Sequence, residues 1–238
     1  MSQERNRAKE ARTNAARRKK KRQKLMMRRA LFLAIAICLV VAIIALVINV
    51  IGKLSVKGAD ASTLTLTENG TVICEEVSPF DRDSYKESEL KSFAKELIDS
   101  FNNTNGKTVV VLDEVKVKKN TAYVKTTFDS MEDYSMFSSY PAYEAKIDTA
   151  MEDGYSFAGN FALVDGGKKV EVIDNFKPSE YTGYYMVVIE ENINVKVPGT
   201  ICFVSDKNTT LVGEDTVVIA QPDGNNDAVD TVYIIYSK

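Results

Sequence analysis

Histidine and tryptophan are both absent from this 238-residue chain, and cysteine and proline are scarce, at three and five residues. Without histidine, the chain alone cannot build a His-containing catalytic triad, a His-ligated zinc site or an imidazole pH switch. The Gly-x-Ser-x-Gly element that carries a nucleophilic serine is also absent. We therefore predict no catalytic residue, no metal site and no cofactor.

Charge is distributed unevenly, although the whole chain has a formal net charge of only -2. Residues 1–29 contain thirteen Lys and Arg against Glu4 and Glu10, a net charge of +11, which leaves -13 for the rest. A basic segment joined to an acidic remainder is typical of a chain whose parts lie in two compartments.

An apolar segment separates these two parts. Every residue from 30 to 48 is apolar, and the segment extends to residue 51. A helix needs about 20 such residues to cross a bilayer, so we predict a transmembrane helix at 30–51. The basic flank places residues 1–29 in the cytoplasm and the C-terminal domain outside. The alternative is a signal peptide cleaved near Ala61, but the apolar run is longer than usual for one, so a retained anchor is favoured.

The basic tail contains one dense cluster of six residues: Arg17, Arg18, Lys19, Lys20, Lys21 and Arg22. The first interpretation is a topology signal, and the second is attraction to anionic lipid head groups at the membrane surface. Nucleic-acid binding is the least favoured interpretation, because no aromatic residues are interleaved to stack on bases. The predicted partners of the tail are therefore the bilayer and its anionic lipids.

Beyond a linker at 52–62, the pattern predicts an α+β domain over residues 63–238, with an amphipathic helix packed on antiparallel sheet. A hairpin is expected at 63–66 and 71–77, and strands at 108–118 and 122–128. The helix would start with a Ser84/Glu87 capping box and end at Asn105-Gly106. Its apolar stripe is Leu90, Phe93, Ala94, Leu97, Ile98 and Phe101. Short helices are expected at 131–140 and 143–153, and a hairpin at 161–164 and 170–173. The last third, after a subdivision near 178–183, is expected to be nearly all strand, at 184–190, 193–197, 200–205, 216–220 and 231–236.

The order of several short segments gives the domain a family resemblance. These segments are Tyr85-x5-Lys91, Asn105-Gly106-Lys107, Val115-Lys116-Val117, Ala122-Tyr123-Val124, Glu132-Asp133-Tyr134 and Val195-Lys196-Val197-Pro198-Gly199. In this order the chain resembles exported lipoproteins and membrane-anchored envelope proteins of Lachnospiraceae-type Clostridia. Many of these proteins carry a lipobox cysteine where this chain has its apolar segment. The resemblance implies a cell-envelope location and implies no activity.

Cys74 and Cys202 both lie in expected strands, where they could form a disulfide or remain buried thiols.

Residues 223–227 begin like a calcium loop, but Ala228 replaces the required glycine, so a turn is the favoured interpretation. Three acidic pairs, Glu75-Glu76, Asp81/Asp83 and Glu190-Glu191, could supply the two carboxyls of a glycoside hydrolase, or could be solvated surface charges.

Aromatic residues are dense between residues 134 and 185. Tyr134, Phe137, Tyr140 and Tyr143 are the candidates for a face that binds a glycan or a peptide, and packing in the core is the alternative.

The favoured hypothesis is a membrane-anchored, non-enzymatic domain that binds or scaffolds an envelope protein or glycan. A wall-polymer hydrolase and a component of a division or secretion complex are the alternatives.

Overall fold

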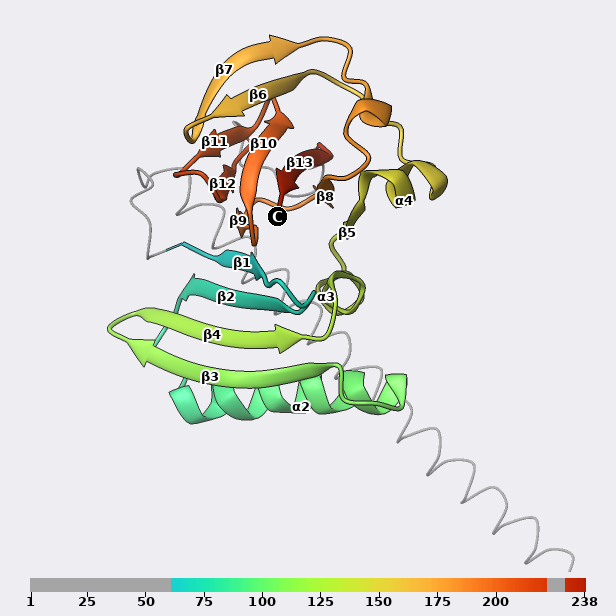
Figure 1. Ribbon diagram of the computed structural model, residues 1–238. Helices are drawn as coiled ribbons and strands as arrows, with labels where there is room; N and C mark the ends of the chain where they lie inside the picture. Colours follow the sequence, from blue (N-terminus) through green and yellow to red (C-terminus); the bar gives the residue numbers. More distant parts are fainter. Residues whose placement is uncertain (1–60, 222–229) are drawn as a thin grey trace, which may run out of the picture. The chain divides into compact units, whose positions relative to one another are not determined.

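The computed structural model of the chain describes residues 61–221 and 230–238 (Figure 1). The basic tail, the expected transmembrane segment, nearly all of the linker and the calcium-like segment 223–227 lie outside these residues. Among the helices of the described residues, none is long and apolar enough to cross a membrane. All described residues belong to one compact unit.

The strands of the described part form two sheets. Sheet A contains β1 (Thr63–Leu66), β2 (Val72–Pro79), β3 (Val110–Lys118), β4 (Thr121–Phe128), β9 (Asn194–Lys196), β11 (Thr209–Leu211) and β12 (Thr216–Ile219). Sheet B contains β5 (Ala142–Lys146), β6 (Phe161–Asp165), β7 (Lys168–Ile173), β8 (Tyr185–Ile189), β10 (Thr200–Ser205) and β13 (Val232–Ser237). Their orders are β11-β12-β9-β1-β2-β4-β3 and β5-β8-β13-β10-β6-β7. The helices are α2 (Glu87–Asn105), α3 (Met131–Ser138), α4 (Ile147–Glu152) and the 3-10 helix η1 (Pro178–Glu180). The α+β class is confirmed, with strand predominating.

Sheet A buries one face and exposes charge on the other. Successive side chains of a strand point to opposite faces, so Val72 and Cys74 are buried, whereas Glu75, the residue after Cys74, is exposed. The buried face continues through Leu64 of β1 and Phe128 of β4 into the main hydrophobic core. Because of this alternation, only one face of sheet A packs against the rest of the domain.

Helix α2 lies along β3 (Figure 1), and side chains near both ends of the helix form hydrogen bonds with the backbone at β3. Near its start, the Glu87 carboxylate accepts a hydrogen bond from the backbone N–H of Val117, at 2.8 Å. Near its end, the Asn102 side-chain oxygen accepts from the N–H groups of Val109 and Val110. These side chains satisfy backbone groups at the edge of the sheet.

The expected capping box is displaced by two residues. The helix begins at Glu87, and the Glu89 carboxylate accepts from the Lys86 N–H at 2.8 Å, while Ser84 lies in the preceding turn. The helix ends at Asn105 and is capped by Gly106, which has a positive φ of 70°, as predicted. Within the apolar stripe only Ile98 is fully buried, because the helix covers the edge of the sheet and its flanks stay in contact with water.

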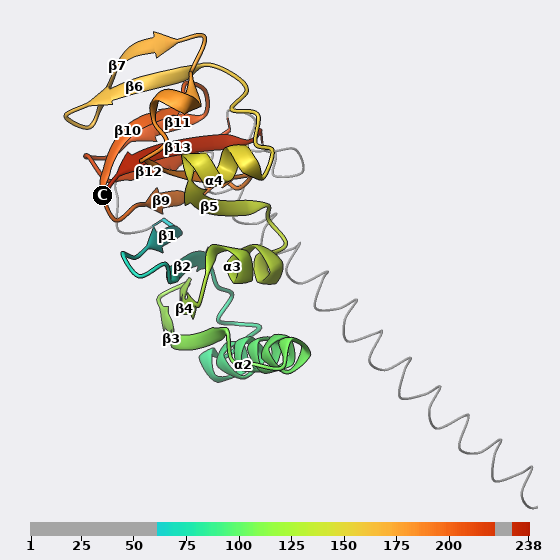
Figure 2. The same ribbon diagram turned by 45° about the vertical axis from the view of Figure 1, so that its right-hand side comes forward.

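The central strands of sheet B are buried on both faces. One face joins the main core through residues such as Val187 and Ile234. The other forms a second core through Met186, Phe203 and Ile235, together with residues of α4. Figure 2 shows α4 lying against sheet B. The strands β8, β10 and β13 therefore read as continuous apolar runs, as strands covered on both faces do.

Two expected elements differ from the structure. Residues 143–146 belong to the edge strand β5, which pairs with β8 from Ala142↔Ile189 to Lys146↔Tyr185, and only Ile147–Glu152 is helical. Pairing with a long neighbouring strand outweighs the local helical pattern here.

The three-residue strand β11 was not predicted, and the C-terminal strands divide between the two sheets instead of forming a sheet of their own. The subdivision expected near 178–183 coincides with η1, which links β7 to β8 within sheet B.

Candidate functional site

Four ionisable side chains from three separate parts of the chain interact beside α3. Cys74 and Glu76 are two residues apart on β2, so they point to the same side of sheet A. Tyr134 comes from α3, and Glu191 comes from the connection between β8 and β9. The Tyr134 hydroxyl donates a hydrogen bond to the Glu191 carboxylate. We call these four residues the α3 cluster.

The start of α3 positions the tyrosine. The Ser130 hydroxyl accepts a hydrogen bond from the Asp133 N–H at 3.1 Å, which caps the helix. Tyr134 then faces the core with only 3% of its surface exposed. Its ring contacts Phe128 edge to face, with the centroids 5.3 Å apart. The hydroxyl is the polar end of a buried ring and needs a partner, which Glu191 provides.

Burial controls the protonation of the cluster. Burial, with a smaller contribution from the negative charge of Glu76, raises the pKa of Glu191 to about 7, although the hydrogen bond from Tyr134 acts to lower it. Desolvation also raises the pKa of Glu76, although the side chain of this residue is exposed and lines the pocket over sheet A. For Cys74 and Tyr134, burial and the neighbouring carboxylates raise the pKa well above the ordinary values. The thiol and the phenol are therefore neutral at physiological pH, and Glu191 is the group that changes charge near neutrality.

Such a carboxyl group can exchange a proton during a reaction, because its pKa lies near the working pH. A glycoside hydrolase additionally needs two carboxyls that flank a cleft. Two of the three acidic pairs named from the sequence contribute one member each here, Glu76 and Glu191, whereas Asp81 and Asp83 lie in the loop between β2 and α2. Glu75 instead lies on the opposite face of β2, and Glu190 accepts a hydrogen bond from Thr231 at 2.6 Å.

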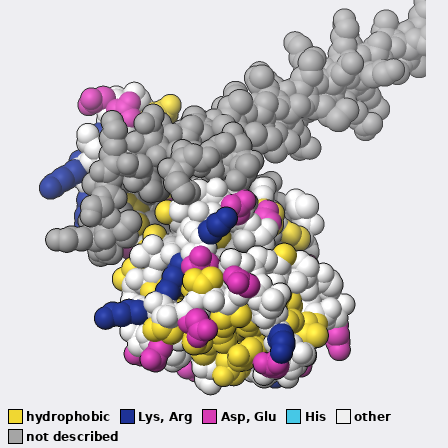
Figure 3. Space-filling view, turned by 90° about the horizontal axis from the view of Figure 1, so that it is seen from above, with side chains coloured by type: hydrophobic (Ala, Val, Ile, Leu, Met, Phe, Trp, Pro, Cys, Tyr) yellow, Lys and Arg dark blue, Asp and Glu magenta, His cyan; other side chains and the backbone are white. Residues whose placement is uncertain are grey.

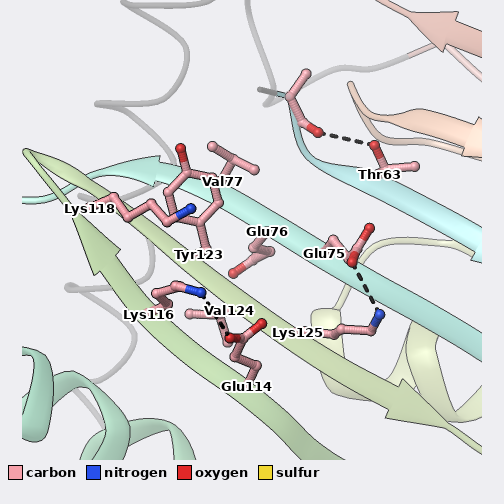
Figure 4. Close-up of a pocket in the computed structure, with 11 residues that line it drawn as sticks. Thr63, Glu75, Glu76, Val77, Glu114, Lys116, Lys118, Tyr123, Val124 and Lys125 are labelled. Carbon is pink, nitrogen blue, oxygen red and sulfur yellow. Dashed lines mark hydrogen bonds and ion pairs between the residues drawn. The ribbon is translucent and has the colours of Figure 1, made fainter. Parts of the chain in front are cut away.

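A pocket of about 260 Å³ lies over β2, β3 and β4 of sheet A (Figure 4). It is lined by Ala61, Thr63, Glu75, Glu76, Val77, Glu114, Lys116, Lys118, Tyr123, Val124 and Lys125. Neither Tyr134 nor Glu191 is part of this lining, so the pocket does not open onto the whole α3 cluster. Ion pairs join Lys125 to Glu75 at 3.2 Å and Lys116 to Glu114 at 3.5 Å. Both pairs are about half exposed, so they stabilise the fold little and leave a polar surface.

Of the two alternatives for Cys74 and Cys202, a disulfide or free thiols, the structure has the free thiols. Cys74 and Cys202 are both free thiols. Cys74 belongs to the main core and Cys202 to the second core, on the other side of sheet B. Pairing of the strands places the two sulfurs on different faces, which the spacing in the sequence could not reveal.

The four aromatic candidates do not form one binding face. Tyr134 and Phe137 pack into the main core, where Phe137 contacts Phe101 at 5.2 Å. Tyr143 belongs to the second core, and its hydroxyl donates to Asp153 at 2.5 Å. Tyr140 is half-buried. The alternative of core packing therefore describes Tyr134 and Phe137.

Most of the other aromatic rings cover the outer side of sheet B. Phe176 lies at the centre of this layer, 4.6 Å from Phe161 and 5.2 Å from Tyr181 between ring centroids. The high density of aromatic residues in this part of the chain was evident from the sequence, but the position of this layer on sheet B was not. Phe176 and Tyr181 flank η1 and follow no periodic pattern.

Hydrophobic side chains also gather at the surface. Figure 3 looks onto the side of the molecule where β6 and β7 lie, and a hydrophobic area is visible there among charged side chains. On β7, Val170 is 56% exposed and Val172 is 50% exposed. The two valines, which we call the β7 patch, lie on a strand that pairs only with β6 among the described strands. No sequence feature distinguished them from core valines.

The remaining predictions concern other residues. The basic cluster Arg17, Arg18, Lys19, Lys20, Lys21 and Arg22 lies outside the described part. Within residues 61–221 and 230–238, no group of three or more Cys, Asp or Glu side chains is arranged to hold a metal ion. Comparisons of the chain with protein-family models, curated proteins and solved structures found no match. The resemblance to exported envelope proteins stays a prediction.

Proposed function

We propose that this chain is a single-pass membrane protein of the cell envelope, whose extracytoplasmic domain binds a protein partner without catalysing a reaction. The apolar segment at 30–51 and its basic flank support the anchor and the topology. The acidic α+β domain is the binding part. The β7 patch is the observation that carries the proposal.

The argument for binding rests on the position and exposure of the two valines. Seven large hydrophobic side chains are exposed in the described part, and β7 holds two of them, two residues apart on a free sheet edge. An edge strand presents unpaired backbone groups beside its side chains, and apolar side chains there favour the addition of a strand from a partner. Clustered apolar surface on a folded domain marks interaction sites more often than chance exposure does.

The test is affinity purification of the full chain from its own membranes after crosslinking, with mass spectrometry of the bound proteins. We expect a reproducible partner that is lost in the double variant Val170→Lys/Val172→Lys. Lysine is well tolerated at exposed sheet edges, so the fold should be unaffected. The matched control is Val111→Lys, which changes a valine of similar exposure, 48%, on β3.

Two results would contradict the proposal. One is a partner that remains bound to the β7 double variant as strongly as to the unmodified chain. The other is a partner that remains bound when residues 62–238 are deleted, because the binding part would then lie in the tail or the membrane segment.

The second candidate function is hydrolysis of a wall polymer, and the α3 cluster is the observation that favours it. Glu191, with a pKa of about 7, is the candidate general acid, and Glu76 is the neighbouring carboxylate. The test is release of reducing ends from purified wall glycans. The hydrolase function is supported if Glu191→Gln and Glu76→Gln abolish this release and the surface change Glu114→Gln does not. No release above that of buffer would exclude these glycans as substrates.

A further inference from the structure

We infer that the α3 cluster is a pH-sensitive contact between the two sheets, which opens more often when Glu191 loses its proton and then exposes Cys74. The contact involves two links between the sheets. Helix α3, with Tyr134, lies between β4 of sheet A and β5 of sheet B, and Glu191 lies between β8 of sheet B and β9 of sheet A. Cys74 and Glu76 lie on β2 of sheet A. This contact depends on neither the membrane anchor nor the β7 patch.

The backbone on both sides of Glu191 is held in place. The Glu190 N–H donates a hydrogen bond to the Pro141 carbonyl at 3.0 Å, and the Asn192 side-chain oxygen accepts one from the Gln221 N–H at 3.0 Å. Glu191 lies between these two bonds, so a fixed backbone directs its side chain toward α3. There its carboxylate accepts the hydrogen bond of the Tyr134 hydroxyl.

The described residues supply no positive charge to the two carboxylates of the cluster. Neither Glu76 nor Glu191 forms an ion pair among them. The other ionisable groups of the cluster, Cys74 and Tyr134, are uncharged at physiological pH, because their pKa values are raised. When Glu191 loses its proton, a negative charge is therefore added beside Glu76 without a counter-charge in this part of the structure.

The other side chains of the surrounding elements do not change this balance. The strands β1 and β4 place the uncharged Leu64 and Thr126 beside Cys74. Glu132 of α3 is exposed to solvent. The remaining acids of β2, α3 and the β8–β9 connection are each bonded to another side chain: Glu75 to Lys125, Asp133 to Ser130, and Glu190 to Thr231. Glu76 and Glu191 are thus the two groups whose charges meet here.

Ionisation of Glu191 shifts the balance between the closed and the open contact. In the open state this carboxyl is in water and has the ordinary pKa of 4.5, whereas in the closed state its pKa is about 7. The closed state therefore holds a proton at pH values where the open state has already lost it. By linkage, the contact is most stable below pH 4.5 and weakens as the pH rises to 7. Between pH 6 and pH 8 the open population should increase about tenfold.

Cys74 is a natural reporter of this opening. Its side chain is only 5% exposed. Leu64 and Thr126 lie opposite it on the two neighbouring strands, so a reagent can reach the thiol only from the core side, where the α3 cluster lies. Reaction at Cys74 therefore requires Tyr134 and Glu191 to move away from β2.

The test is the rate at which a water-soluble thiol reagent modifies Cys74 at pH 6, 7 and 8. The protein is the full chain in detergent, carrying Cys38→Ser and Cys202→Ser, so that Cys74 is the remaining thiol. Each rate is divided by the rate for the same chain unfolded in denaturant at the same pH. This correction removes the increase in thiolate that any cysteine shows as the pH rises.

We expect the corrected rate to rise about tenfold from pH 6 to pH 8. In Glu191→Gln, which cannot ionise and can still accept the hydrogen bond of Tyr134, the corrected rate should not depend on pH. The matched control is Glu114→Gln, an exposed glutamate that should leave the rise unchanged. A corrected rate that does not change with pH in the parent chain overturns the inference, and so does an equal rise in Glu191→Gln.

A second measurement separates local opening from unfolding of the whole domain. Opening of this contact exposes little surface, so urea below the unfolding transition should leave the rate at Cys74 nearly unchanged. A rate that increases with urea as steeply as global unfolding does would show that Cys74 is reached only through the unfolded state. That result would also overturn the inference.

Discussion

Glu191 holds its proton more tightly in the folded chain than in the unfolded chain. Burial raises its pKa from the usual value of about 4.5 to about 7. Between these two pH values the native state binds more protons than the unfolded state. The stability that this group contributes is therefore fully present below about pH 4.5 and is lost as the pH rises to 7. Above pH 7 the native state keeps a charge that is largely buried.

Replacing this group with a neutral amide gives the first prediction at the residue scale. Glu191→Gln cannot become charged and can still accept the hydrogen bond of Tyr134. We expect the variant to be more stable than the unmodified chain at pH 8, by roughly 2 kcal/mol, and nearly equal at pH 5. Denaturant unfolding at both pH values measures the difference. Glu114→Gln is the control, since this side chain is exposed and paired only at the surface.

A variant that is less stable than the unmodified chain at pH 8 would contradict this account of the α3 cluster. It would mean that the ionised form of Glu191 stabilises the native state through its bond with Tyr134. The gain from that bond would then exceed the cost of burying the charge.

Single residues could be identified from the sequence more easily than their partners. All four residues of the α3 cluster were named from the sequence, but for three unrelated reasons: Cys74 as a possible disulfide partner, Tyr134 as an aromatic binding residue, and Glu76 and Glu191 as members of two acidic pairs. Their meeting depends on β1 and β9 pairing in parallel, which brings the β8–β9 connection beside β2. Residues 63 and 194 are far apart in the chain, and no local pattern specifies that they pair.

At the scale of single elements, the β6–β7 turn offers a matched pair of glycines. Both have positive φ, 52° at Gly166 and 71° at Gly167. A Cβ atom on Gly166 would meet nothing within 4 Å, whereas one on Gly167 would lie 2.6 Å from the backbone oxygen of Gly213. Gly213 belongs to the connection between β11 and β12, so this contact joins the edges of the two sheets.

We predict that Gly166→Ala lowers the free energy of unfolding by about 1 kcal/mol, from the left-handed backbone alone. Gly167→Ala adds a backbone clash and should cost about 2 kcal/mol more. Thermal unfolding of the two variants side by side makes the comparison, with the unmodified chain as reference. Equal losses would show that the two sheet edges separate without cost at this point.

Elements with a clear period were predicted well. The hairpin β3–β4, the strand β10 and the C-terminal end of α2 lie within two residues of their expected bounds, because alternation and a glycine stop are local signals. Elements that depend on a distant neighbour were not. The strand β5 exists because β8 offers it an edge, and β11 is three residues long and is held by β12.

At the scale of the whole molecule, the sequence predicted the α+β class, and it could not predict the division of the last six strands between two sheets. Strands β8, β10 and β13 belong to sheet B, while β9, β11 and β12 belong to sheet A. The apolar strand β12, with three successive buried residues, joins sheet A, although its sequence is like that of the sheet B strands, so composition does not say which sheet a strand joins. The β7 patch follows from the same division, since β7 is an edge only because of the strand order in sheet B.

The central claim is that this domain lies outside a membrane that the chain crosses once. The most direct test is labelling of intact cells with a membrane-impermeant maleimide. Cys202 is partly exposed, whereas Cys74 is buried, and Asn120→Cys adds a second reporter at the exposed hairpin tip. We predict that both reporter positions are labelled on intact cells and that Cys202→Ser removes the signal of the unmodified chain. Labelling of Asn120→Cys only after the membrane is permeabilised would contradict the account.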